Sequence, residues 1–177
     1  MKIVIIGSVA AGTSVAAKIR RNDENCEIKI FEKDTDISYS SCGLPYFIGE
    51  DYIERENITR RNPSWFKKRF NFDIFTAHEV LSIAHINKKL EIISINSGDT
   101  FTESYDKLVI ATGAKVNMPN IPNIDWDNTF VLKNVHDADR IKNFIKEKSP
   151  KKALIVGSGF IGLEILDNFH KLGIEST

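Results

Sequence analysis

The chain has 177 residues, of which 42% are apolar and 27% charged, a composition typical of a globular protein with room for one full core and part of another. Its 24 basic and 24 acidic residues cancel, which removes the electrostatic reason to expect nucleic acid or an anionic membrane as a partner. Two cysteines, Cys26 and Cys42, are too few for a disulfide framework and favour a reducing, cytoplasmic setting; no stretch reaches the ~18 apolar residues that a membrane span needs.

The first 32 residues are predicted to form a nucleotide-binding unit. A strand over residues 3–6, a glycine turn, a helix and a second strand together have about the ~30-residue length of a dinucleotide-binding βαβ unit. Glu32 follows the second strand, where a carboxylate can accept both hydroxyl groups of an adenosine ribose; its alternative is a solvated strand end. A signal peptide could also begin with a basic residue and an apolar run, but the second apolar run, EIKIFE, favours the strand.

The turn of this unit reads GSVAAG. Gly7 and Gly12 stand at the first and third positions of the dinucleotide-binding fingerprint, whereas Val9 stands where the middle glycine is expected. The small side chains of Ala10 and Ala11 can compensate for the closer approach that the missing glycine would have allowed. The N–H groups at the start of the helix would then hold a pyrophosphate.

The segment SYSSCGLPYFIGE, residues 38–50, places Cys42 between small polar residues and a Gly-Leu-Pro turn. Gly43 lets the main chain approach a ligand closely, and Leu44-Pro45 is typical of a helix start, where the helix dipole stabilises a thiolate. The thiolate is the reactive form of cysteine, so Cys42 is a candidate redox residue. The alternative is an ordinary loop with a buried thiol, and Cys26 is interpreted as a structural or surface thiol.

The middle of the chain alternates apolar and polar residues over 72–111, with turn signals at INKK and NSGD, which predicts a β-meander. It ends in YDKLVIATGA, an apolar strand that enters a Thr-Gly turn. The fragment HEVLS, which contains His78, lacks the second histidine of a zinc helix, so no metal site is predicted. Residues 119–128 are predicted to be a linker, and residues 137–148 a surface helix.

A second nucleotide-binding unit is predicted near the end of the chain. An apolar strand over residues 153–156 leads into GSGFIG, in which Gly157, Gly159 and Gly162 complete the fingerprint. The helix over residues 160–172 then shows apolar residues at the spacing of one packed face: Ile161, Ile165, Leu166 and Phe169. The next strand and its acidic residue are expected after Thr177, so this unit is predicted to be truncated.

Four features follow one another along the chain: the first glycine fingerprint, the cysteine segment, the meander ending in Ala111-Thr112-Gly113, and the second glycine fingerprint. In this order they resemble the FAD-dependent pyridine nucleotide–disulfide oxidoreductases. The resemblance implies an α/β fold. Its first part is a Rossmann-like FAD-binding domain, which consists of a parallel sheet with a β-meander. The first strand and helix of a second, truncated Rossmann-like NAD(P)-binding domain follow. The implied boundaries are residues 1–118 for the N-terminal part of the FAD-binding domain, 119–150 for a linker and surface helix, and 151–177 for the start of the NAD(P)H-binding domain.

The cysteine pattern separates branches of this family. Members similar to glutathione reductase have a second cysteine where this chain has Phe47, so Cys42 resembles the single redox cysteine of the coenzyme A-disulfide reductase, NADH oxidase and NADH peroxidase branch. Peroxidases and many oxidases of that branch carry a histidine where this chain has Ala10, which disfavours chemistry on peroxide. The cysteine segment is most similar to that of the coenzyme A-disulfide and persulfide reductases.

The resemblance implies three sets of binding residues beside the catalytic Cys42. The FAD contacts are Gly7, Val9, Ala10, Ala11, Gly12, Glu32, Lys33, Ser41, Val80 through its backbone, Ala111, Thr112 and Gly113. The NADH or NADPH contacts are Gly157, Gly159, Phe160, Ile161 and Gly162, with Phe160 as an aromatic gate over the flavin. The substrate contacts are Ser14, Lys18, Arg21, Ser38 and Ser41, although helix-surface cations such as Lys18 and Arg21 usually face water.

The implied activity is electron transfer from NAD(P)H through FAD to a small-molecule disulfide, either coenzyme A disulfide or a persulfide, in a cytoplasmic enzyme. A homodimer is expected for a full-length member, with its interface outside these residues. Two alternatives stay open: an NADH oxidase of the same family, and a truncated, non-catalytic nucleotide-binding fragment. By itself, the 177-residue chain is expected to be inactive.

Overall fold

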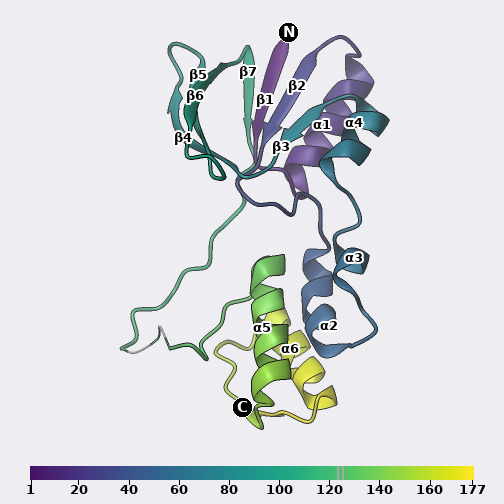
Figure 1. Ribbon diagram of the computed structural model, residues 1–177, viewed down its shortest axis with the longest axis vertical. Helices are drawn as coiled ribbons and strands as arrows, with labels where there is room; N and C mark the ends of the chain where they lie inside the picture. The colour runs from purple at the N-terminus through teal and green to yellow at the C-terminus, as the bar shows by residue number, and fades with distance from the viewer. Residues whose placement is uncertain (123, 125) are drawn as a thin grey trace. The chain divides into compact units, whose positions relative to one another are not determined.

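The structure is a computed structural model that describes residues 1–122, 124 and 126–177. It contains two compact units, which are described one at a time (Figure 1). The sheet unit comprises Met1–Tyr39 and Thr59–Ala114, and the helix unit comprises Ser40–Ile58 and Lys115–Thr177. The domain boundaries expected from the sequence, at residues 118 and 150, stay predictions.

The sheet unit is built on a four-stranded parallel sheet with the strand order β3-β2-β1-β7. Its strands are β1 (Lys2–Ile6), β2 (Glu27–Phe31), β3 (Asp73–Phe75) and β7 (Lys107–Ile110). Helices α1 (Ala11–Asn22) and α4 (Pro63–Phe70) lie on one side of this sheet, and the antiparallel strands β4 (His78–Ala84), β5 (Lys89–Ser94) and β6 (Thr100–Ser104) lie on the other (Figure 1). The arrangement confirms the α/β class and the parallel sheet with a β-meander.

The apolar run of β1 explains why both faces of the sheet are covered. Successive side chains of a strand point to opposite faces, so Ile3 and Ile5 share one face while Val4 and Ile6 share the other. Ile3 and Ile5 pack in a core with Ala16 of α1, whereas Val4 and Ile6 pack in a second core with residues of the meander. All four side chains are buried.

The meander is shorter than the sequence predicted. The pattern over residues 72–111 indicated one continuous meander, but the first and last strands of that range, β3 and β7, pair in parallel with β2 and β1. Only β4, β5 and β6 form the antiparallel sheet. Phe72 and Ile74 are buried in the core beneath α4, and this burial favours the parallel pairing.

Glu103 of β6 joins the meander to the parallel sheet. Its carboxylate accepts hydrogen bonds from Lys2 of β1 and Lys29 of β2, the latter at 2.9 Å. Burial opposes ionisation of Glu103, but the two lysine hydrogen bonds outweigh it and lower the pKa of the carboxyl. The hydrogen bond to Glu103 in turn raises the pKa of Lys29. This cluster is a pH-sensitive link between the two sheets.

Within its described residues, the helix unit contains four α-helices, the 3₁₀ turn Ser41–Gly43 and a short two-stranded sheet. The helices are α2 (Leu44–Gly49), α3 (Arg55–Ile58), α5 (Val135–Lys148) and α6 (Phe160–Lys171). The start of α5 is set by a reciprocal cap, in which the Asn134 side chain accepts from the Asp137 N–H and the Asp137 carboxylate accepts from the Asn134 N–H. The helix predicted over 137–148 therefore begins two residues earlier.

Strand β8 (Lys152–Ala153) pairs in parallel with β9 (Glu175–Ser176). The strand predicted over 153–156 is thus only partly formed, and the following strand, expected after Thr177, already begins at Glu175. The predicted linker 119–128 includes residues 123 and 125, which lie outside the described residues. Among the residues that are described, no helix is both long and apolar enough to cross a membrane.

The buried face of α6 differs from the predicted one. Ile165 is buried and Phe169 is half-buried, but Ile161 and Leu166 are 58% and 42% exposed. The polar Asn168 is fully buried in their place. Helix α6 contacts α2, and this contact selects the Ile165–Asn168 side of the helix.

Candidate functional site

The first glycine turn is a place of close backbone approach. Gly7 has φ +91°, and a Cβ at this position would overlap the carbonyl oxygen of Ala111. A Cβ at Gly12 would overlap the carbonyl of Gly7. The glycine turn therefore contacts both the start of α1 and the segment after β7. As a result, two predicted FAD-binding segments of the sheet unit lie next to each other: the Gly7–Gly12 turn and Ala111–Gly113.

The start of α1 is open to an anion. Ala10 stands at the N-cap and contributes no hydrogen bond from its side chain. Ala10 and Ala11 are exposed, and Val9 is half-buried, so no large side chain closes the turn. Because helix N-terminal N–H groups attract phosphates, this geometry fits the pyrophosphate of a dinucleotide.

Glu32 is buried at the end of β2, with 8% of the residue exposed. Its Oε2 accepts hydrogen bonds from both the N–H and the hydroxyl of Ser8, each at 2.8 Å, and its Oε1 accepts from the N–H of Asp34 at 3.0 Å. Glu32 therefore ties the glycine turn to the loop after β2. Ser8 was not among the predicted site residues, although a serine directly after the first fingerprint glycine was a visible signal.

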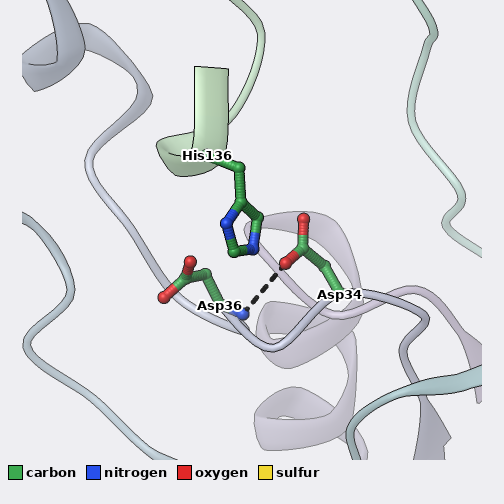
Figure 2. Close-up of side chains that lie close together, drawn as sticks. All are labelled: Asp34, Asp36 and His136. Atoms are coloured by element: carbon green, nitrogen blue, oxygen red, sulfur yellow. Dashed lines mark hydrogen bonds between the residues drawn. The ribbon is translucent and has the colours of Figure 1, made fainter. Parts of the chain in front are cut away.

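The loop after Glu32 is ordered by its own aspartate. The carboxylate of Asp34 accepts from the N–H groups of Thr35 and Asp36, and the second of these bonds, at 3.3 Å, is drawn in Figure 2. Aspartate side chains commonly hold turns in this way. Lys33, a predicted FAD contact, is exposed in the same loop, whereas Val80 is half-buried in β4 and pairs with Ile92 of β5.

The three predicted substrate contacts on α1 share one side of that helix. Ser14, Lys18 and Arg21 are separated by four and three residues, the spacing of neighbours on a helix surface, and all three are exposed. Ser38 is half-buried and belongs to the sheet unit, whereas Ser41 is exposed and belongs to the helix unit.

Cys42 is a free, exposed cysteine in a single 3₁₀ turn, Ser41–Gly43, that leads directly into α2. The N–H of Gly43 donates to the carbonyl of Ser40 at 3.0 Å, and a proline in the first turn of α2 favours the helix start. Cys26, in contrast, is a buried free thiol of the sheet unit, 3% exposed. The placement of Cys42 against the first glycine turn stays a prediction, because the two belong to different units.

The second glycine turn repeats the geometry of the first. Gly157 has φ +117°, and a Cβ at Gly162 would overlap the Gly157 carbonyl, as at Gly7 and Gly12. Gly159 is the N-cap of α6 and provides no side-chain cap. Phe160 is 87% exposed beside it, and Ile161 is exposed as well. This turn also fits a dinucleotide phosphate at the start of its helix.

The chain matches one known protein family along its whole length. The model of the family described as pyridine nucleotide-disulphide oxidoreductase matches residues 1–177. The chain belongs to this family. It is 40% identical over 176 residues to the coenzyme A disulfide reductase of Staphylococcus haemolyticus (strain JCSC1435), covering 99% of this chain and 39% of that protein.

Two solved structures of the family superpose closely on the chain. The reduced CoADR-RHD of Bacillus anthracis has a TM-score of 0.95 at 42% identity, and an NAD-dependent persulfide reductase from A. fulgidus has a TM-score of 0.93 at 34% identity. In both cases the match covers 99% of this chain and 32% of the other chain. The chain therefore spans about two fifths of the curated relative and about a third of these structures.

Proposed function

We propose that this chain is the N-terminal part of a flavoprotein that passes electrons from NADH or NADPH to a coenzyme A disulfide or a persulfide, with Cys42 as its single redox cysteine. The proposal rests on the exposed thiol of Cys42, which forms no disulfide and lies in the 3₁₀ turn directly before α2. Phe47, which stands where a partner cysteine would be, is buried at 5% exposure. The second sulfur must then come from the substrate.

The sheet unit would hold FAD, which when bound supplies a two-electron relay between nicotinamide and sulfur. The N–H groups at the start of α1 would bind its pyrophosphate, and Glu32 would accept hydrogen bonds from the adenosine ribose. Ser8 contributes by holding Glu32 through two donors. In the helix unit, the Gly157–Gly162 turn would bind the pyrophosphate of NADH or NADPH.

Cys42 would perform the exchange step. Its thiolate attacks one sulfur of the substrate disulfide, a Cys42–substrate disulfide forms, and the other half of the substrate leaves as a thiolate. Two electrons and a proton then regenerate the Cys42 thiolate and release the second thiol. The exposed face of Ser14, Lys18 and Arg21 on α1 supplies hydrogen-bond donors and positive charge suited to the phosphates of coenzyme A.

The 177-residue chain alone is proposed not to turn over NADH, because it covers only 39% of the curated relative. A homodimer and a cytoplasmic location belong to this proposal for the whole protein. Ala10 offers no proton donor for chemistry on peroxide. The alternative function is that of an NADH oxidase, which would consume oxygen and form a Cys42 sulfenate; the test must distinguish it from disulfide reduction.

The test is incubation of the chain with coenzyme A disulfide, followed by mass spectrometry of the cysteine peptides. We expect one coenzyme A to become attached at Cys42 and one to be released, with no reaction at the buried Cys26. The variant Cys42→Ser should release none, while Cys26→Ser should behave as wild type. A visible spectrum recorded after addition of FAD and removal of the unbound FAD checks flavin binding independently. Modification of Cys26 alone, or the absence of a mixed disulfide at Cys42, would contradict the proposed substrate.

A further inference from the structure

Lys142 of α5 is a buried lysine, 8% exposed, that reaches the carboxyl end of α2. Its Nζ donates to the backbone carbonyls of Phe47, Glu50 and Ile53, at 2.6, 3.2 and 3.4 Å. The ammonium also lies 4.4 Å from the centre of the Phe47 ring. The last carbonyls of a helix lack partners within the helix, so a cation at this end satisfies them and complements the helix dipole.

This arrangement uses all the bonding capacity of a lysine. An ammonium group has three N–H donors, and here there are three acceptor carbonyls. Burial, with a smaller contribution from Lys146, lowers the pKa of Lys142, as expected for a cation removed from water. A buried ammonium is tolerated only when it is fully hydrogen-bonded, so the geometry indicates a specific role for this side chain.

Backbone hydrogen bonds connect this contact with the cysteine. The Gly43 N–H donates to Ser40, the Leu44 N–H donates to Ser41, and at the other end of α2 the Glu50 N–H donates to Tyr46. The 3₁₀ turn and α2 thus form one continuous hydrogen-bonded segment. A displacement at its carboxyl end is therefore transmitted along the helix to the turn that carries the thiol.

We propose that Lys142 is a positioning residue for Cys42: it holds the carboxyl end of α2 against α5 and thereby keeps the thiol in one place at the start of the same segment. The proposal rests on the proposed redox role of Cys42. Attack on a bound disulfide requires the sulfur in line with the S–S bond, and a displacement of about 1 Å can cost roughly a hundredfold in rate. Lys142 would act through α2, without contact to the substrate.

The experiment compares the 177-residue wild-type chain with Lys142→Met, Lys142→Arg and the control Lys146→Met. Lys146 lies one turn further along α5 and is exposed, so its substitution removes the same charge without the three bonds. Coenzyme A disulfide is added at increasing concentration, and release of coenzyme A is followed in a single turnover. The amplitude reports the number of reactive thiols per chain, which is one for a folded chain with Cys26 buried, whereas the limiting rate constant reports the placement of the sulfur. Hydrogen exchange of the α2, α5 and α6 amides is measured in parallel.

For Lys142→Met we expect a limiting rate constant at least about threefold lower, with unchanged amplitude. We also expect roughly tenfold faster exchange of the α2 amides, while those of α5 and α6 stay protected, since a lost charge-assisted hydrogen bond changes an opening equilibrium by about this factor. Lys142→Arg should recover part of both effects, and Lys146→Met should match wild type.

Equal rate constants and equal α2 exchange in wild type and Lys142→Met would overturn the proposal. If Lys142→Met does not fold, Lys142→Gln, which retains an amide donor, takes its place in the same comparison. If the wild-type chain forms no mixed disulfide at Cys42, the proposed redox function fails. Amide exchange in α2 then still decides whether Lys142 holds this helix.

Discussion

Replacement of Gly49 by alanine tests the contact between α2 and α6. Gly49 is the last residue of α2, and it lies against Asn168, which is fully buried on α6. A Cβ added at Gly49 would be 2.7 Å from Asn168 Cγ and 2.5 Å from Asn168 Cβ, and it would overlap Oδ1. The amide can rotate away, but the Cβ of Asn168 can move only if the two helices separate.

The size of the effect follows from two opposing contributions. Overpacking of a buried contact costs about 1–3 kcal/mol, and alanine in place of glycine in a helix returns about 0.5–1 kcal/mol. Because the closest fixed atom is bonded directly to the backbone, we expect the upper part of the range. Gly49→Ala should therefore lower the free energy of unfolding of the helix unit by about 1–2 kcal/mol. Urea unfolding followed by far-UV circular dichroism measures this change.

Matched variants separate this contact from a general effect of alanine. Gly159 has no atom within 4 Å of an added Cβ, so Gly159→Ala should cost only the difference between a glycine and an alanine N-cap, about 0.5–1 kcal/mol. Asn168→Ala keeps the obstructing Cβ and should relieve the Gly49→Ala defect only in part, whereas Asn168→Gly should relieve most of it once its own helix cost is subtracted. A neutral or stabilising Gly49→Ala would refute the helix register described here.

Two further predictions concern the sheet unit. Because the pKa of Glu103 is lowered in the folded state, its contribution to stability is complete above the usual value of 4.5 and is lost as pH falls through the folded pKa. Glu103→Gln should therefore lower the free energy of unfolding by about 1–2 kcal/mol near neutral pH, and the difference from wild type should shrink in acid. A difference in urea midpoint that does not depend on pH would contradict this. Ser8→Ala removes one of the two donors to Glu32 and should cost about 1–2 kcal/mol in the same unfolding assay, with flavin affinity reduced about tenfold or less by equilibrium titration. Unchanged stability would show that the Ser8 hydroxyl does not hold the carboxylate.

Local features of the fold could be predicted from the sequence because neighbouring residues decide them. The apolar run of β1, the two glycine turns and the helix after each turn depend on burial and backbone freedom within a few residues. Glu32 could be placed at the end of β2 from its distance along the chain. The predicted nucleotide and substrate contacts rest on these patterns and on the family resemblance, and they remain predictions.

Contacts between distant segments were decided only by the tertiary structure. The alternation over residues 72–111 could not distinguish antiparallel from parallel pairing, since both have the same period of two. Strand β7 pairs with β1, which lies about a hundred residues earlier in the chain. Periodicity also favoured Leu166 over Asn168 on the buried face of α6, but that face is selected by the approach of Gly49. Lys142 lies in the segment predicted as a surface helix, and only the folded chain brings three backbone carbonyls to its ammonium. Sequence patterns record the preference of each residue for burial, whereas the carbonyls that make burial of Lys142 favourable come from a segment about ninety residues earlier.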